Sequence, residues 1–117
     1  MEPNSADLNE LQTKVLDLLR KNTTGITRGK LQQDIFVFQN PSNDRAIRRA
    51  IAELRERGFV ITSASDHAGY MLTTDHEAVK HYLNESIKRA KKIMRTARKV
   101  RQAYGLKDQM SLLGGAS

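Results

Sequence analysis

The 117-residue sequence contains no cysteine and no tryptophan, and only 5% of its residues are aromatic. Without cysteine, the chain can form neither a disulfide nor a thiolate metal site. It also lacks any apolar run near the ~20 residues that a membrane-spanning helix needs. Its first ten residues are acidic and polar, unlike a secretory signal. We therefore expect a cytoplasmic protein with no membrane contact.

Patterns typical of catalysis are also missing. His76 and His81 are five residues apart and would not share a helical face, which argues against a metal site. Glu53 and Glu56 lie among arginines that would hold them ionised, so they are poorly suited to acid–base chemistry. We expect no enzyme, no cofactor and no metal.

Positive charge is concentrated in one segment. The net charge is +7, yet residues 1–79 hold ten Lys and Arg against eleven Asp and Glu, whereas residues 80–101 hold nine against one. Such a block indicates an anionic partner, most often nucleic acid, with a solvated helix face as the competing interpretation.

Two short helices are predicted first. Leu8, Leu11, Val15, Leu18 and Leu19 form a helical stripe that opens at Ser5 or Asp7. A short strand at residues 25–27 is possible, and Thr27 is expected to cap a second helix that runs to about Ile35. Residues 36–38 are expected to anchor the core.

A third helix is predicted to start near Asn43, with Asp44 as its cap, and to end before Gly58. Ile47, Ile51 and Leu54 share one face, whereas the exposed face would hold Arg45, Arg48, Ala52 and Arg55. Residues 59–62 and 70–73 are β-branched and apolar, and the turn-rich residues 63–69 separate them. This pattern predicts a β-hairpin.

Residues 8–72 resemble the winged helix-turn-helix DNA-binding proteins of bacteria and phages, of the biotin-repressor type. The resemblance rests on the order of the helices, on ELRERGFVI at residues 53–61 and on GYML at residues 69–72. It implies a protein of a bacterial cell or a phage-infected host. Eight residues, 36–43, are expected to separate the second and third helices, more than the usual tight turn.

The resemblance implies a third helix set in the major groove of double-stranded DNA, where arginine matches guanine and asparagine matches adenine. The hairpin loop and the start of the second helix would contact the backbone. The residues expected to bind DNA are Thr27, Arg28, Lys30, Asn43, Arg45, Arg48, Arg49, Arg55, Ser65, His67, Lys88, Lys91, Lys92, Arg95, Arg98 and Lys99.

A long fourth helix, capped by Thr74 or Asp75, is predicted to follow. Its apolar positions alternate steps of four and three, as in a coiled coil. This seam must be buried against a second copy or against the preceding domain, and we favour a homodimer. The seam residues are Val79, Leu83, Ser86, Ala90, Ile93, Ala97, Val100 and Tyr104, widened by Ile87 and Met94.

The C-terminal residues 109–113 (QMSLL) resemble the pentapeptide by which bacterial replication and repair proteins bind the sliding clamp, through Gln109, Leu112 and Leu113. A frayed apolar tail that packs on the helix is the alternative. The predicted organisation is a flexible N-terminus (1–7), a winged-helix domain (8–74), a basic amphipathic helix for dimerisation (75–104) and a flexible tail (105–117).

The predicted fold is mainly α with a small β-hairpin. The predicted function is that of a DNA-binding transcriptional regulator or DNA-transaction factor. Two alternatives stay open: a phage or prophage replication accessory protein recruited to the clamp through its tail, and a winged-helix module used only for protein contacts.

Overall fold

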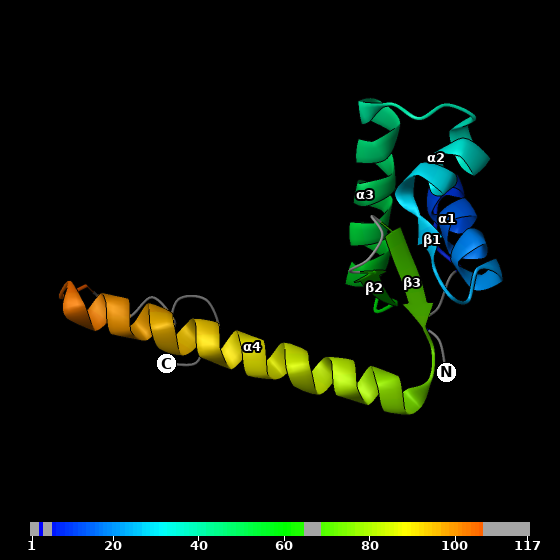
Figure 1. The fold of residues 1–117 in the computed structure, drawn as a ribbon. Helices are drawn as coiled ribbons and strands as arrows, with labels where there is room; N and C mark the ends of the chain where they lie inside the picture. The colour runs from blue at the N-terminus through cyan, green and yellow to red at the C-terminus, as the bar shows by residue number, and fades with distance from the viewer. Residues whose placement is uncertain (1–2, 4–5, 65–68, 107–117) are drawn as a thin grey trace. The chain divides into compact units, whose positions relative to one another are not determined.

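The computed structural model describes residues 3, 6–64 and 69–106, with only the backbone at Ala64. The chain divides into two units, residues 1–79 and 80–117 (Figure 1). The elements in order are α1 (Glu10–Lys21), β1 (Ile26–Thr27), α2 (Arg28–Phe36), α3 (Pro41–Glu56), β2 (Val60–Ala64), β3 (Gly69–Thr73) and α4 (His76–Ala103). The prediction of a mainly α fold with a small antiparallel β element is therefore confirmed.

The first helix begins later than predicted. Asn9, not Ser5 or Asp7, is the N-cap of α1, and its side chain accepts a hydrogen bond from the backbone N–H of Gln12. The Gln12 side chain in turn accepts from the Asn9 backbone N–H, which completes a capping box. This reciprocal pair gives partners to two backbone N–H groups at the helix start. The helix therefore begins after Asn9 and not after Ser5 or Asp7.

The third helix begins earlier than predicted. Asn40 is its N-cap, Pro41 occupies the first turn, and Asn43 lies inside the helix. The prediction that Asp44 caps the helix is wrong, because the Asn40 side chain already accepts from the Asn43 N–H at 2.8 Å. The connection between α2 and α3 is therefore the four residues 37–40, a tight turn instead of the expected eight-residue segment.

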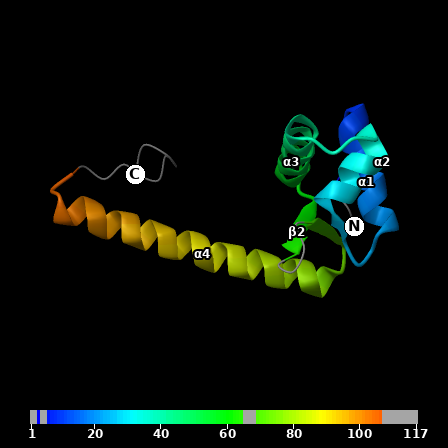
Figure 2. The same cartoon turned by 45° about the horizontal axis from the view of Figure 1, so that its top comes forward.

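The core lies where α1, α2 and α3 meet (Figures 1 and 2). The predicted stripe of α3 is fully buried, together with Ala50. Residues 36–38 were expected to anchor this core, and that prediction is wrong for two of them: Val37 and Phe38 are each 70% exposed, whereas Phe36 packs against the core. The buried apolar residues are Val15, Leu16, Leu19, Ile26, Leu31, Ile47, Ala50, Ile51, Leu54, Phe59, Ile61 and Tyr70.

The predicted hairpin is present, and β1 extends it to three antiparallel strands in the order β1-β3-β2. Gly69 faces Thr27 across β1 and β3, where a Cβ on Gly69 would clash with the Ile26 carbonyl and lie 2.8 Å from Thr27 Cα. Only glycine allows this close approach. Gly58, which ends α3, has φ +98°, as its predicted helix-terminating role requires.

The described part of the second unit, residues 80–106, consists almost entirely of α4. Asp75 accepts from the Ala78 N–H at 3.0 Å at the start of α4, so one of the two predicted caps is confirmed. The helix has no buried side chain. Several of its large apolar residues are well exposed: Leu83 at 54%, Ile93 at 64% and Val100 at 50%.

Candidate nucleic-acid interface

The exposed side of α3 is cationic. Arg45, Arg48 and Arg49 are all exposed, whereas Ile47, Ala50 and Ile51 beside them are at most 1% exposed. Because the apolar side of the helix is fixed in the core, the arginine side points in one defined direction away from it. Among the described residues, Arg45 and Arg49 have neither a hydrogen-bond nor an ion-pair partner.

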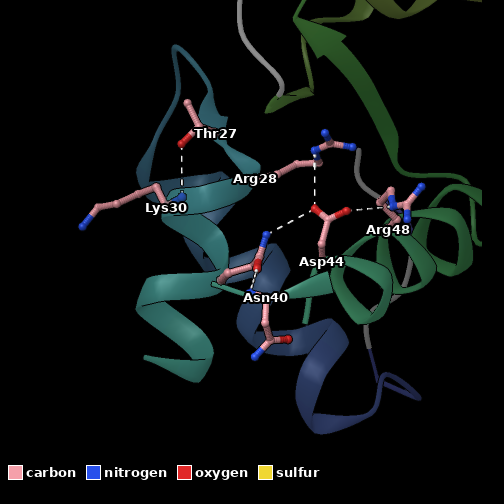
Figure 3. A network of polar contacts seen from close by, with 7 residues as sticks. Thr27, Arg28, Lys30, Asn40, Asp44 and Arg48 are labelled. Atoms are coloured by element: carbon pink, nitrogen blue, oxygen red, sulfur yellow. Dashed lines mark hydrogen bonds and ion pairs between the residues drawn. The ribbon is translucent and has the colours of Figure 1, made fainter. Parts of the chain in front are cut away.

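Asp44 lies at the centre of a polar network at the start of α3 (Figure 3). Its Oδ2 lies 3.1 Å from Arg48 Nε, and its Oδ1 lies 3.5 Å from Arg28 Nε. One carboxylate therefore positions two of the arginines predicted to bind DNA, one from each helix of the α2–α3 pair. The Asp44 side chain is 24% exposed, so these pairs are partly screened by solvent.

Two buried glutamines hold α3 near both of its ends. The Gln32 Nε2 donates to Asp44 Oδ1, and its Oε1 accepts from the Asn40 N–H. The Gln12 Nε2 donates to Glu53 Oε1 at 3.1 Å. Both glutamines are less than 10% exposed, and each uses donor and acceptor together, as buried amides require. Sequence reasoning missed both.

The start of α2 also contributes polar groups near α3. The Thr27 hydroxyl accepts from the Lys30 N–H and so caps α2, as predicted, while Lys30 Nζ pairs with Asp34 at 2.9 Å. The side-chain Nδ2 of Asn43 donates to the Phe38 carbonyl, which holds the turn before α3. Thr27, Lys30 and Asn43 were all predicted to contact DNA, and each has a polar partner within the chain.

Arg55 connects α3 to the hairpin. Its Nε donates to the Ile61 carbonyl at 2.8 Å, and Nη2 lies 3.4 Å from Ser63 Oγ. Its guanidinium also lies 5.8 Å from the centre of the Tyr70 ring, within the range of a cation–π contact. These contacts give Arg55 a structural function that links helix and sheet.

The basic face predicted on α4 is exposed throughout. It is the side away from the apolar seam, and of its residues Lys88 lies 3.7 Å from Glu85. The exposed residues of this basic face are Lys88, Lys91, Lys92, Arg95, Arg98 and Lys99.

Several predicted site residues lie outside the described part of the chain. Ser65 and His67 belong to the hairpin loop, and the clamp-like motif comprises Gln109, Leu112 and Leu113. Their proposed contacts stay predictions from sequence.

Within residues 3, 6–64 and 69–106, no group of three or more His, Asp or Glu side chains is arranged to hold a metal ion. In the same residues, no helix combines the length and apolarity needed to cross a membrane. Comparison with protein-family models, with curated proteins and with solved structures found no match.

Proposed function

We propose that the N-terminal unit is a winged helix-turn-helix domain that binds double-stranded DNA, with α3 in the major groove. The observation that supports this most directly is the pair Arg45 and Arg49, which are exposed and have no partner among the described residues. Guanidinium groups on a rigid helix match the two acceptors on the major-groove edge of guanine. Such a protein would act as a transcriptional regulator or in another DNA transaction.

The arrangement of elements supports the proposal. Two helices joined by the tight turn 37–40 are followed at once by a β-hairpin, which is the order of a helix-turn-helix with a wing. Arg28 and Lys30 at the start of α2 are candidates for phosphate contacts, and Arg48 shares the Asp44 carboxylate with Arg28. Phosphate contacts provide affinity without sequence information.

Binding measurements with substituted proteins test the proposal. A preferred duplex is first selected from a random library, and mobility shifts are then recorded with that duplex and with a scrambled one. Replacing Arg45 and Arg49 with alanine should weaken binding to the selected duplex by about tenfold or more, because each good arginine–guanine pair contributes roughly 1–3 kcal/mol. Binding to the scrambled duplex should weaken less.

The matched control removes the same charge elsewhere. Lys14 and Lys21 are exposed on α1, and replacing both with alanine should leave the preference for the selected duplex unchanged. Equal losses in the two double variants would mean that the arginines of α3 contribute only charge, and the recognition role would be wrong. No selected duplex at all would contradict the proposal as a whole.

One observation favours a second candidate function, a protein-contact module. Val37 and Phe38 form an apolar tip on the turn before α3, each 70% exposed, and Val37 has φ 74°, a conformation that is unfavourable for a β-branched residue. Exposed apolar groups held in a strained turn are typical of contact sites. Replacing Phe38 with serine should then abolish binding to a partner protein while leaving DNA binding intact.

A further inference from the structure

An apolar stripe runs along α4, and no other segment of the described residues 80–106 covers it. The large apolar side chains on and beside it are 40% to 76% exposed, and the helix has no buried residue. A helix of this length extends for ~40 Å, so the stripe is far larger than an isolated exposed leucine. The large exposed members of the stripe are Leu83, Ile93, Val100 and Tyr104, and the exposed Tyr82, Ile87 and Met94 flank it.

The charges of α4 indicate what kind of surface covers this stripe. The basic face, as defined above, lies on the side away from the stripe. A partner with an acidic surface would be attracted to that far side, not to the stripe. The stripe itself repeats every 3.5 residues on average, the spacing that two helices bury when they supercoil around each other.

The positions that flank the stripe favour a second copy of the same helix. In a parallel, in-register pair, a residue on one flank of the stripe faces the residue five positions later on the opposite flank of the other helix. Tyr82 would face Ile87, Arg89 would face Met94, and Thr96 would face Arg101 of the second copy. Arg89 and Arg101 therefore meet neutral side chains, and Lys80 would lie opposite Asp75, the acidic residue that precedes α4.

An antiparallel pair is less favourable. When the stripes are aligned about their midpoint between Lys91 and Lys92, Lys80 of each helix faces Arg101 of the other, at both ends. Like charges placed opposite each other are repulsive. We therefore propose that α4 forms a parallel, in-register two-stranded coiled coil with α4 of a second copy. Ser86, Ala90 and Ala97 are small enough for the two backbones to approach closely.

Cross-linking of the full chain tests this pairing. Because the chain has no cysteine, one introduced cysteine reports on a single position. Ser86→Cys lies on the stripe and should form a disulfide-linked dimer under mild oxidation, whereas Lys88→Cys on the far side of the helix should not. Light scattering of the unmodified protein should give twice the mass of the 13.2 kDa chain.

Two results would overturn the proposal. The first is a monomer at tens of micromolar protein together with no cross-link by Ser86→Cys. The second is a cross-link that forms only when Ser86→Cys and Ala97→Cys proteins are mixed, which is the antiparallel result. Neither measurement contains DNA, so a failure here is separate from a failure of the proposed DNA binding.

A double substitution that disrupts the stripe without changing the net charge is a second test of the dimer. Leu83→Gln combined with Ile93→Gln removes two large apolar groups from the stripe and should convert the dimer to a monomer. The matched control, Lys88→Gln combined with Lys91→Gln, changes two residues of the basic face and should keep the dimer. The helical circular dichroism of the unmodified protein should also rise with concentration.

Discussion

The helices α3 and α4 share one sequence pattern but have different surroundings. Both carry apolar residues on one side and cations on the other, yet Ile47 and Leu54 of α3 are fully buried, whereas Leu83 and Ile93 of α4 are 54% and 64% exposed. Hydrophobic periodicity therefore predicts which side of a helix seeks a partner. It does not predict whether that partner lies in the same chain.

The polar contacts of the two helices differ in the same way. Two buried glutamines and Arg55 tie α3 to α1, to α2 and to the hairpin. Within α4, Lys88 pairs with Glu85 and the Thr96 hydroxyl donates to the Lys92 carbonyl, contacts between residues three and four positions apart on the same helix. The cations of α3 are thus presented by a fixed scaffold, which suits recognition, whereas those of α4 depend on one helix.

The largest contrast should come from truncating apolar residues. Ile51→Ala in α3 leaves a cavity in the core and should lower the free energy of unfolding by about 2–5 kcal/mol. Ile93→Ala in α4 should leave the unfolding of the N-terminal unit unchanged, because that unit folds around its own core. Urea denaturation followed by circular dichroism compares the two. Equal losses would show that the two helices are buried alike.

A smaller loss is expected when a buried amide is removed. Gln32→Leu strands the Asn40 N–H and one acceptor of Asp44, and should cost about 1–3 kcal/mol of the free energy of unfolding. Gln33→Leu is the matched control, because Gln33 is the exposed neighbour on the same helix. The same denaturation experiment separates them, and indistinguishable values would mean that the network at Asp44 does not stabilise α3.

Local signals in the sequence predicted much of the fold. The apolar stripes of α1 and α3, the Thr27 cap, the left-handed Gly58 and the hairpin all follow from near neighbours, and the structure bears them out. The starts of α1 and α3 were placed wrongly because several capping residues precede each helix. The winning caps, Asn9 and Asn40, are those whose side chains reach a backbone N–H three residues on.

The errors in the candidate site have a different cause. Gln12 and Gln32 are polar residues whose burial depends on long-range partners, Glu53 and Asp44, which no local pattern indicates. The Asn9-x-x-Gln12 spacing was the one available signal, since it is typical of a capping box. Val37 and Phe38 are apolar yet exposed, because the turn directs them away from the core.

Removing the N-cap side chains of α3 and α4 should have effects of intermediate size. Asn40→Ala should cost about 1 kcal/mol of the free energy of unfolding, because the Asn43 N–H loses its acceptor. Asp75→Ala removes the equivalent acceptor of α4, for the Ala78 N–H, and should reduce helical circular dichroism. The exposed Ser42 in the first turn provides the control, and Ser42→Ala should change neither quantity. Unchanged stability in Asn40→Ala would contradict the assigned cap.

The smallest effects on stability should come from the exposed cations. Arg45→Gln in α3 and Lys91→Gln in α4 each remove one positive charge, and surface changes of this kind alter the free energy of unfolding by less than about 0.5 kcal/mol. Their effects on DNA binding should nevertheless differ. If Lys91 contacts a phosphate as proposed, Lys91→Gln should weaken binding to all duplexes and reduce the slope of log K against log [salt] by about one.

Arg45→Gln should instead reduce the preference for the selected duplex, because the proposed recognition by α3 has Arg45 contact a base edge. Titrations of both variants at several salt concentrations, with selected and scrambled duplexes, measure the two quantities separately. If Lys91→Gln also changed the sequence preference, the basic face of α4 would contribute to recognition. The division between a fixed reading helix and a helix that contributes charge alone would then be wrong.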